Sequence, residues 1–311
     1  MKVHHSINSF KEKNQSSVLT IGTFDGVHIG HQKIIERLNQ IKSSKKYKSV
    51  ILTFFPHPRK VLNYDDDFKM LNTIDEKIQL LEKFGLNDLV IEPFTKEFSR
   101  LTALEFVRDI LVNELHLKNL VIGYDHQFGK NREGNFEQLQ EFGELYGFNV
   151  EEISVQEIEN VSVSSTKIRK AINDGEIEKA NTYLGYHYLL SGEIVKGKGL
   201  GRKLNFPTLN LYIKEDYKLI PKTGVYIVKT TINNNLIFGI MNIGYRPTVN
   251  GKYQTIEIHL LDFKADLYGN KMQIEVLKRL RDEKKFDSLE SLIQEIQKDE
   301  KTARDWITNQ G

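Results

Sequence analysis

Two histidines and three glycines occupy one short turn near the start of the chain, and together they suggest phosphate chemistry. Residues 22–32 read Gly-Thr-Phe-Asp-Gly-Val-His-Ile-Gly-His-Gln, between the apolar run 18–21 and a helical pattern. Glycine lets a phosphate approach the main chain closely. His28 and His31 lie at the mouth of the helix, where backbone amides and the helix dipole favour anions and an imidazole can donate to phosphate oxygens. The turn predicts a triphosphate site; the alternative is a glycine-rich turn whose histidines only cap the helix.

Two later loops carry aromatic and polar residues that could hold a flat ligand. Residues 54–59 read Phe-Phe-Pro-His-Pro-Arg, and residues 123–130 read Gly-Tyr-Asp-His-Gln-Phe-Gly-Lys; each loop follows an apolar run. Aromatic side chains offer large flat contact areas suited to an isoalloxazine or adenine ring. The alternative is that the prolines stiffen a turn and the aromatic rings fill the core.

A fourth segment, residues 163–169, reads Val-Ser-Ser-Thr-Lys-Ile-Arg. Ser164 or Ser165 is a good N-cap, and capping alone could explain the serines. Lys167 and Arg169 then fall in the first turns of a helix, where cations oppose the dipole. An anion bound between them would remove that conflict, which favours a phosphate contact.

The second half of the chain contains a glycine-rich and lysine-rich stretch that leads into Phe-Pro-Thr-Leu-Asn at 206–210. It is not a Walker A loop, because no Lys-Ser or Lys-Thr follows the glycines and no crossover helix comes after them. The glycines alone favour a simple hairpin. The Thr208 hydroxyl and the Asn210 carbonyl, however, are hard oxygen ligands suited to Mg²⁺. Glu257 lies in an alternating strand pattern, where it could be an ordinary outward-facing residue; His259 on the same face is expected to be structural.

Strand and helix patterns alternate in the first part of the chain. Strand signals lie at 18–21, 50–54, 89–91, 120–122 and 150–153, and helical signals lie at 34–41, 75–84, 106–111 and 136–146. This order predicts a Rossmann-like α/β domain with a mostly parallel sheet and right-handed crossovers. Ligands bind beyond the carboxyl ends of the strands in such sheets, and the three strand-following loops described above lie there.

Near residues 184–187 the pattern changes to successive strands. We therefore predict two domains, 1–184 and 185–311. Strand signals lie at 188–195, 225–232, 236–243, 255–261 and 272–280, with a hairpin signal at 233–235. Short strands without intervening helices predict an antiparallel β-barrel. Apolar residues from Leu289 to Trp306 recur at helical spacing and predict a C-terminal helix that packs over the barrel.

Length and composition agree with two globular domains. The chain has 311 residues, of which 39% are hydrophobic and 28% charged, and a net charge of +2. This balance gives no electrostatic case for nucleic acid binding. The absence of cysteine excludes disulfides and thiolate chemistry. Because the sequence has neither a bilayer-spanning apolar stretch nor a signal-peptide pattern, we expect a cytoplasmic protein.

The turn at 22–32 resembles the adenylyltransferase signature of bifunctional riboflavin kinase/FAD synthetases, and its HxGH pair also marks the wider nucleotidyltransferase superfamily. The segments at 54–59, 123–130 and 163–169 resemble further elements of that family in order and spacing. The resemblance implies catalytic roles for His28 and His31. It implies nucleotide contacts at Gly22, Phe24, Asp25, Gly30, Ser164, Ser165 and Arg169, and flavin contacts at Phe54, Pro56, Asp125 and Phe128. The chain departs from the family pattern at Tyr124, His126 and Gln127.

Residues 192–211 resemble the riboflavin kinase signature, in which a flexible glycine loop precedes a PTAN element. Asn205 stands where glycine is usual and Leu209 where alanine is usual, and neither change removes a ligand oxygen. Residues 239–248 and 255–263 also resemble kinase segments. The resemblance implies that Glu257 is the general base. It also implies Mg²⁺ ligands at Thr208 and Asn210, and nucleotide contacts at Gly197, Gly199, Gly201 and Asn242.

The resemblance covers nearly the whole chain and implies two reactions: riboflavin and ATP give FMN, and FMN and a second ATP give FAD and pyrophosphate. ATP would be the co-substrate and Mg²⁺ the metal. The implied partners are riboflavin, FMN and ATP, without nucleic acid, membrane or an obligate protein partner.

Two alternatives stay open from the sequence. One is a different nucleotidyltransferase fused to an unrelated barrel, which the HxGH pair cannot exclude but the kinase signature opposes. The other is a regulatory flavin-binding protein with inactive sites, which the intact His28, His31, Asn210 and Glu257 oppose.

Overall fold

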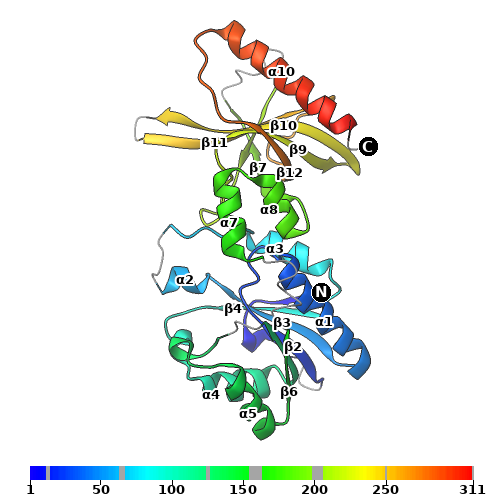
Figure 1. Cartoon of the computed structure of the whole chain (residues 1–311), viewed down its shortest axis with the longest axis vertical. Helices are drawn as coiled ribbons and strands as arrows, with labels where there is room; N and C mark the ends of the chain where they lie inside the picture. Colours follow the sequence, from blue (N-terminus) through cyan, green and yellow to red (C-terminus); the bar gives the residue numbers. More distant parts are fainter. Residues whose placement is uncertain are drawn as a thin grey trace. The chain divides into compact units, whose positions relative to one another are not determined.

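The computed structural model describes residues 1–11, 15–62, 67–123, 127–153, 163–197, 206–248 and 251–309. The chain forms two compact units, Met1–Ser165 and Thr166–Gly311, each of which is described by itself below. Figure 1 labels most of their helices and strands. Among the described helices, none combines the length and the apolar character that a membrane span requires.

The first unit alternates strands with helices. Its strands are β1 (Lys2–His4), β2 (Ser17–Ile21), β3 (Lys48–Phe55), β4 (Asp88–Pro93), β5 (Leu117–Gly123) and β6 (Asn149–Ile153). Its helices and helical turns are η1 (Ile7–Ser9), α1 (Ile29–Lys45), α2 (Pro58–Val61), α3 (Ile74–Glu82), η2 (Phe98–Arg100), α4 (Ala103–Glu105), η3 (Phe106–Glu114), η4 (Lys130–Arg132) and α5 (Phe136–Tyr146). Of these, η3 continues α4 as a π-helical segment.

The strands of the first unit form a sheet in the order β1-β4-β3-β2-β5-β6, and every pair is parallel. The parallel sheet predicted from the sequence is confirmed. The chain moves outward from β2 to β3 and β4, then returns to place β5 on the other side of β2. The strand order therefore reverses between β2 and β5, which is where open parallel sheets bind their ligands.

Helices cover both faces of this sheet. On one face, α1 buries Ile34, Ile35, Leu38 and Ile41, the positions that the helical spacing predicted. On the other, η3 and α5 contribute Phe106, Leu111 and Leu139 to a core shared with the alternate residues of the strands. Strands buried on both faces need continuous apolar runs, and β2 and β3 supply them.

The second unit contains two short helices, a set of strands and a long terminal helix. The helices are α7 (Ser165–Asp174), whose first residue is the last of the first unit, α8 (Ile177–Leu184) and α10 (Leu289–Thr308). The strands are β7 (Tyr188–Val195), β8 (Leu209–Tyr212), β9 (Gly224–Ile232), β10 (Asn235–Thr248), β11 (Gly251–Leu260) and β12 (Lys271–Arg281).

The strands of the second unit close into a barrel in the order β10-β11-β8-β7-β12-β9, and each pairing is antiparallel. The predicted hairpin joins β9 to β10 through Asn233 and Asn234, whose positive φ angles of 49° and 64° suit a tight two-residue turn. On α10, Ala303, Trp306 and Ile307 pack against apolar side chains of the strands. The predicted barrel and its covering helix (orange to red in Figure 1) are confirmed.

Some elements were not predicted. The strand β1 is short and polar, so it lacks a detectable apolar pattern, and α2 and α8 are also short. The strand β8 follows the glycine-rich stretch and has a short sequence, Leu-Asn-Leu-Tyr, that we interpreted as part of a ligand motif. Its pairing with β7 and β11 is what closes the barrel.

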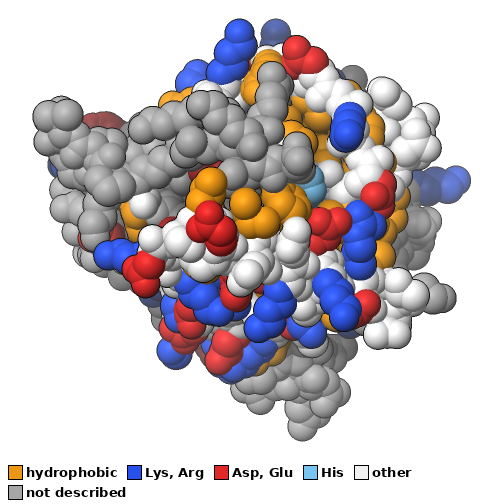
Figure 2. Space-filling view, turned by 90° about the horizontal axis from the view of Figure 1, so that it is seen from above, with side chains coloured by type: hydrophobic (Ala, Val, Ile, Leu, Met, Phe, Trp, Pro, Cys, Tyr) orange, Lys and Arg blue, Asp and Glu red, His pale blue; other side chains and the backbone are white. Residues whose placement is uncertain are grey.

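Charges are mixed on the face drawn in Figure 2, where lysine and arginine side chains alternate with aspartate and glutamate. The chain carries 44 Lys and Arg residues against 42 Asp and Glu residues. This distribution agrees with the small net charge.

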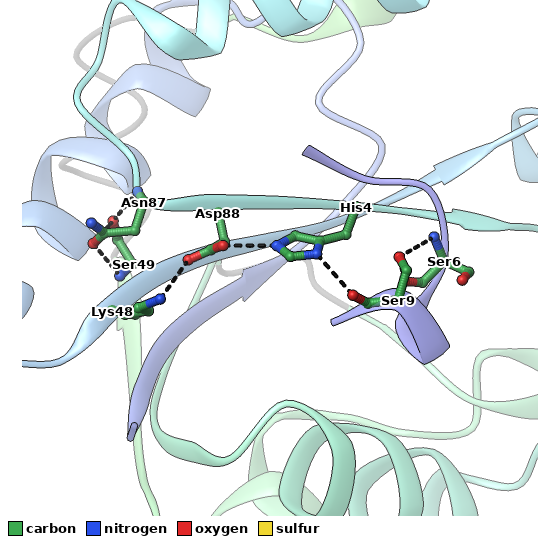
Figure 3. A network of polar contacts seen from close by, with 7 residues as sticks. All are labelled: His4, Ser6, Ser9, Lys48, Ser49, Asn87 and Asp88. Atoms are coloured by element: carbon green, nitrogen blue, oxygen red, sulfur yellow. Dashed lines mark hydrogen bonds and ion pairs between the residues drawn. The ribbon is translucent and has the colours of Figure 1, made fainter. Parts of the chain in front are cut away.

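A buried polar network ties β1 to β4 and β3 (Figure 3). His4 Nε2 lies 2.8 Å from Asp88 Oδ1, and His4 Nδ1 lies 3.2 Å from the Ser9 carbonyl oxygen. Lys48 Nζ lies 3.8 Å from the other carboxylate oxygen of Asp88, whose side chain is 2% exposed. Because β1 is so short, this carboxylate is a principal anchor of the sheet edge.

We therefore expect Asp88→Ala to destabilise the first unit. It leaves the buried His4 imidazole and the Lys48 ammonium without their carboxylate, and an unsatisfied buried polar group costs about 1–3 kcal/mol. The free energy of unfolding, measured by urea denaturation, should fall by about that amount. Asp109→Ala is the matched control, because Asp109 is 48% exposed and pairs with the adjacent Arg108; it should change stability by less than ~1 kcal/mol. Equal stability of the two variants would contradict the assignment.

Candidate active sites

The turn between β2 and α1 lies at the carboxyl edge of the parallel sheet, beside the point where the strand order reverses. Its backbone is unusual, because Phe24 and Val27 adopt positive φ angles of 46° and 39° without being glycine. Such conformations are strained for non-glycine residues and persist only where their surroundings hold them. The conformation of the turn is therefore fixed by its surroundings.

His28 and His31 stack on each other at the first turn of α1. Their ring centroids lie 3.6 Å apart with 17° between the planes, and the Phe24 ring lies 4.9 Å from His31. His28 is the N-cap: its Nδ1 accepts the His31 amide at 3.3 Å. Capping requires an unprotonated Nδ1, which leaves the proton of a neutral His28 on Nε2.

His31 does not cap the helix. Its Nδ1 is buried and has no hydrogen-bond partner within the described part of the chain. Burial, followed by the nearby charges of His28 and Lys77, holds the pKa of His31 well below its usual value. The predicted pair is therefore together in space, with one member capping the helix and the other a neutral imidazole that still has hydrogen-bonding capacity.

Two buried donors hold the carbonyl of Thr23. Lys77 Nζ donates to it at 2.6 Å from α3, and Thr53 Oγ1 donates to it at 3.2 Å from β3. Lys77 is 0% exposed. Loss of hydration lowers its pKa to about 8, and this shift is opposed by the charge of Asp25.

Asp25 is also fully buried, and its contacts join three segments. Its Oδ1 accepts the Leu71 amide at 2.8 Å, and its backbone carbonyl accepts the Ser165 hydroxyl at 2.8 Å. The predicted nucleotide residues Asp25 and Ser165 are thus brought together. The carboxylate is engaged with the main chain before α3, so it shapes the turn.

The sequence analysis missed Lys77. A signal was present, because Lys77 lies three and four positions before Leu80 and Leu81, which are buried on α3. A lysine in the apolar stripe of a helix is unusual and would have marked a buried cation.

The predicted flavin residues differ in exposure. Phe54 is 9% exposed and packs on Phe94 and Phe98, while Phe128 is 7% exposed and lies 6.0 Å from the Phe106 ring. Both rings belong to the hydrophobic core beneath the loops. Pro56, which follows a cis peptide bond, is exposed on the surface. Of these three predicted flavin residues, only Pro56 presents much surface to solvent.

Other predicted residues are placed with less detail or not at all. Gly22 and Gly30 flank the turn, and Ser164 is exposed next to the start of α7, which holds the half-buried Arg169. The positions Tyr124, Asp125, His126, Gly199, Gly201 and Asn205 lie outside the described residues.

In the barrel, three predicted residues form one row across neighbouring strands. Glu257 of β11 is directly opposite Asn210 of β8 on one side and Asn242 of β10 on the other. Directly opposite residues point to the same face of a sheet. The flanking Ile256 and Ile258 are buried, whereas the three polar residues are half-buried on the opposite face.

Two contacts shape the ends of this row. His259 Nδ1 lies 2.9 Å from the Pro207 carbonyl oxygen, so the ring holds the residue just before Thr208. At Gly197, an added Cβ would collide with the side-chain amide of Asn210. The His259 contact agrees with the structural role expected of it, and any side chain at 197 would have to displace the Asn210 amide.

Among the described residues, no group of three or more His, Cys, Asp or Glu side chains could hold a metal ion. That finding concerns His, Cys, Asp and Glu side chains only and does not cover the hydroxyl oxygen of Thr208 or the amide oxygen of Asn210. Asn210 lies in the row and Thr208 lies two positions before it on the chain, and the Asn210 carbonyl and the Thr208 hydroxyl are hard oxygens of the kind that Mg²⁺ prefers.

Comparison with known families divides the chain at nearly the same place as the structure. Residues 10–167 match the FAD synthetase family, and residues 184–307 match the riboflavin kinase family. The first match contains the β2–α1 turn, and the second contains the barrel row.

Individual relatives match over almost the whole chain. A bifunctional riboflavin kinase/FMN adenylyltransferase from Listeria monocytogenes is 38% identical, with 97% of this chain and 96% of the relative covered. The protein of that name from Escherichia coli K12 is 36% identical, with 99% and 98% covered.

A solved structure also matches throughout. It is named macrolide-efflux protein from Streptococcus pneumoniae and superposes with a TM-score of 0.87 at 28% identity, covering 98% of each chain. The solved structure shows the same two-unit architecture. The two family matches and the identities of the relatives show the family: the chain belongs to the bifunctional riboflavin kinase/FMN adenylyltransferases.

Proposed function

We propose that the two halves of the chain carry out successive reactions, with residues 1–184 as the FMN adenylyltransferase and residues 185–311 as the riboflavin kinase. The family matches at 10–167 and 184–307 support this division. They leave α7 and α8 between them. The boundary at residue 184 stays a prediction: Ser165, at the start of α7, bonds to the β2–α1 turn, whereas Asn181 of α8 bonds to the Val276 carbonyl of β12.

In the adenylyltransferase half, a phosphate oxygen of FMN attacks the α-phosphorus of ATP. The bond from that phosphorus to the α,β-bridging oxygen breaks, and pyrophosphate leaves. The protein contributes by positioning the reactants and by stabilising charge as it develops on the phosphates, without a covalent enzyme intermediate. His28 and His31 act at the α- and β-phosphates, next to the N-terminus of α1.

One observation carries this assignment: the paired imidazoles lie at the N-terminus of a helix, at the edge of the sheet where the strand order reverses. Helix dipole, backbone amides and imidazole donors there all favour a polyanion. Ser164, Ser165 and Arg169 are proposed to close on the same phosphates. Gly22, Phe24, Asp25 and Gly30 are proposed to shape the nucleotide pocket.

The flavin contacts at Phe54, Pro56, Asp125 and Phe128 stay predictions. Because Phe54 and Phe128 are packed in the core, we propose that their rings form the wall of the flavin pocket rather than a stacking platform.

In the kinase half, the terminal hydroxyl of the ribityl chain attacks the γ-phosphorus of ATP, and ADP leaves. Glu257 takes the hydroxyl proton as the new oxygen–phosphorus bond forms. Asn242 and the glycine segment at Gly197, Gly199 and Gly201 bind the nucleotide. The row of Asn210, Glu257 and Asn242 on neighbouring strands supports a shared site for these roles.

We propose that Thr208 and Asn210 hold Mg²⁺ at this site. A bound Mg²⁺ would neutralise charge on the ATP phosphates. Thr208 lies two positions before Asn210, and His259 holds the preceding carbonyl of Pro207. Location in the cytoplasm, and action without nucleic acid, membrane or an obligate protein partner, also stay predictions.

Purified protein with riboflavin, ATP and Mg²⁺ should produce FMN and then FAD on chromatography, and His31→Ala should block only the second product. Removing a donor that stabilises transition-state charge lowers kcat by about 10²–10³-fold. His5→Ala, at an exposed histidine of the same unit, is the control and should behave as wild type. Parallel loss of both products in His31→Ala would contradict independent sites.

Glu257→Gln should have the opposite effect. Loss of a positioned general base lowers the rate of FMN formation by about 10²–10⁴-fold. Added FMN should still be converted to FAD at the wild-type rate, and urea denaturation should show that the barrel is as stable as in the wild type. Glu178→Gln changes an exposed glutamate on α8 and should leave both rates unchanged. A Glu257→Gln variant with full kinase activity would rule out the assigned base.

Thr208→Val should weaken the use of Mg²⁺ by the kinase alone, because valine keeps the shape of threonine and removes the ligand oxygen. The Mg²⁺ concentration for half-maximal FMN formation should rise at least about tenfold, a loss of about 1.4 kcal/mol. The measurement is a Mg²⁺ titration of each activity. An unchanged midpoint for FMN formation would remove Thr208 from the metal site.

A further inference from the structure

Lys77 is a buried cation that none of the proposed roles uses. It lies on α3, is 0% exposed, and donates its hydrogen bond to the Thr23 carbonyl at 2.6 Å. Burying a charged group is costly, and a methionine or leucine would fill the same space without that cost. The other buried residues of α3 are Leu80, Leu81 and Glu76, and the Glu76 carboxylate accepts the Thr73 amide at the start of the helix.

The contacts of Lys77 lead directly into the β2–α1 turn. The Thr23 carbonyl that it holds precedes Phe24, whose φ of 46° is left-handed. The Phe24 ring packs 4.9 Å from His31, and His31 stacks on His28. A shift of the Thr23 peptide would therefore move the surface on which the His31 ring rests.

A second contact keeps α3 in register with the turn. The Asp25 carboxylate accepts the Leu71 amide at 2.8 Å, in the segment that leads to α3. Two hydrogen bonds thus join the β2–α1 turn to the segment that contains α3. Lys77 of α3 donates to the turn, and Asp25 of the turn accepts from Leu71. The opposite charges of Lys77 and Asp25 also attract each other, since Asp25 raises the pKa of Lys77 against the effect of burial.

We infer that Lys77 is a positioning residue for adenylyl transfer: its ammonium fixes the Thr23 carbonyl and, through the Phe24 turn, the orientation of the His31 imidazole. This rests on the proposed adenylyltransferase site. In this role Lys77 does not contact the reacting phosphates but acts through the β2–α1 turn. Its ammonium also places a positive charge on the buried side of that turn.

The first test is Lys77→Met, which keeps the length of the side chain and removes the ammonium. Misplacement of a reacting group by about 1 Å can cost about 10²-fold in rate. We expect kcat for FAD formation to fall by about that factor while KM for ATP changes less than about threefold, because the residue orients rather than binds. Lys83→Met, at the exposed end of the same helix, is the matched control and should behave as wild type.

FMN formation should be unchanged in Lys77→Met and reports an intact second unit, while urea denaturation of the same sample reports the fold of the first unit, in which Lys77 lies. If kcat for FAD formation stays within about threefold of wild type, the inference is wrong. If KM rises and kcat is kept, Lys77 is a binding determinant and the positioning role is again excluded.

A second measurement follows the imidazole itself in the free protein. The charge of Lys77 is one of the causes that depress the pKa of His31. Its removal should raise the pKa of His31, which NMR titration of the imidazole protons can follow, with Lys83→Met unchanged. An unchanged His31 titration in Lys77→Met would show that the ammonium does not act on His31.

Chemical rescue separates the ammonium from general packing. The chain has no cysteine, so Lys77→Cys provides a single thiol that can be alkylated in urea before refolding. Reaction with 2-bromoethylamine restores an ammonium at nearly the length of lysine, whereas 1-bromopropane gives an uncharged side chain of the same size. We expect FAD formation to return with the first and not with the second. Equal activity of the two products, both with full kinase activity, would overturn the inference.

His31→Ala distinguishes this inference from the proposed function. If His31→Ala keeps FAD formation, the adenylyltransferase site itself is misassigned. If His31→Ala is inactive and Lys77→Met is not, the site stands and the role of Lys77 fails.

Discussion

The main-chain carbonyls of the β2–α1 turn are fixed by hydrogen bonds from side chains. The turn depends on them because two of its residues, Phe24 and Val27, adopt left-handed conformations without being glycine. Lys77 and Thr53 hold the carbonyl of Thr23, and the Ser165 hydroxyl holds that of Asp25. Each donor comes from a different segment of the unit. The position of the two imidazoles therefore depends on the packing of α3 and of the sheet, and on the chain that begins α7, as much as on the turn itself.

In the barrel, strand pairing positions the predicted site residues. Its polar row needs no buried charge, because strand register alone aligns Asn210, Glu257 and Asn242. The residues that flank Glu257 along β11, Ile256 and Ile258, are buried in the core. One half of the chain thus depends on side-chain hydrogen bonds to a strained loop, and the other on the pleat of an antiparallel sheet.

Much of this architecture was predictable because the strong signals are local. The apolar runs of β2 and β3 and the helical spacing of α1 identify the parallel sheet, and the glycine and histidine positions identify the turn that the sequence predicts to bind phosphate. The burial of Lys77 was not predicted, since it depends on which face of α3 meets the turn. The strand β8 was missed for a similar reason: a four-residue strand has little pattern of its own and is defined by its partners β7 and β11.

The row in the barrel also limits how this protein can change over evolutionary time. Because side chains alternate between the two faces of a strand, inserting or deleting a single residue within β11 would exchange Glu257 with a core isoleucine. A carboxylate would enter the hydrophobic interior and an apolar group would replace the proposed base. Unless a β-bulge absorbs the extra residue, as the register shifts between β12 and β9 show is possible elsewhere in this barrel, loss of the fold and loss of the reaction would arise from the same event.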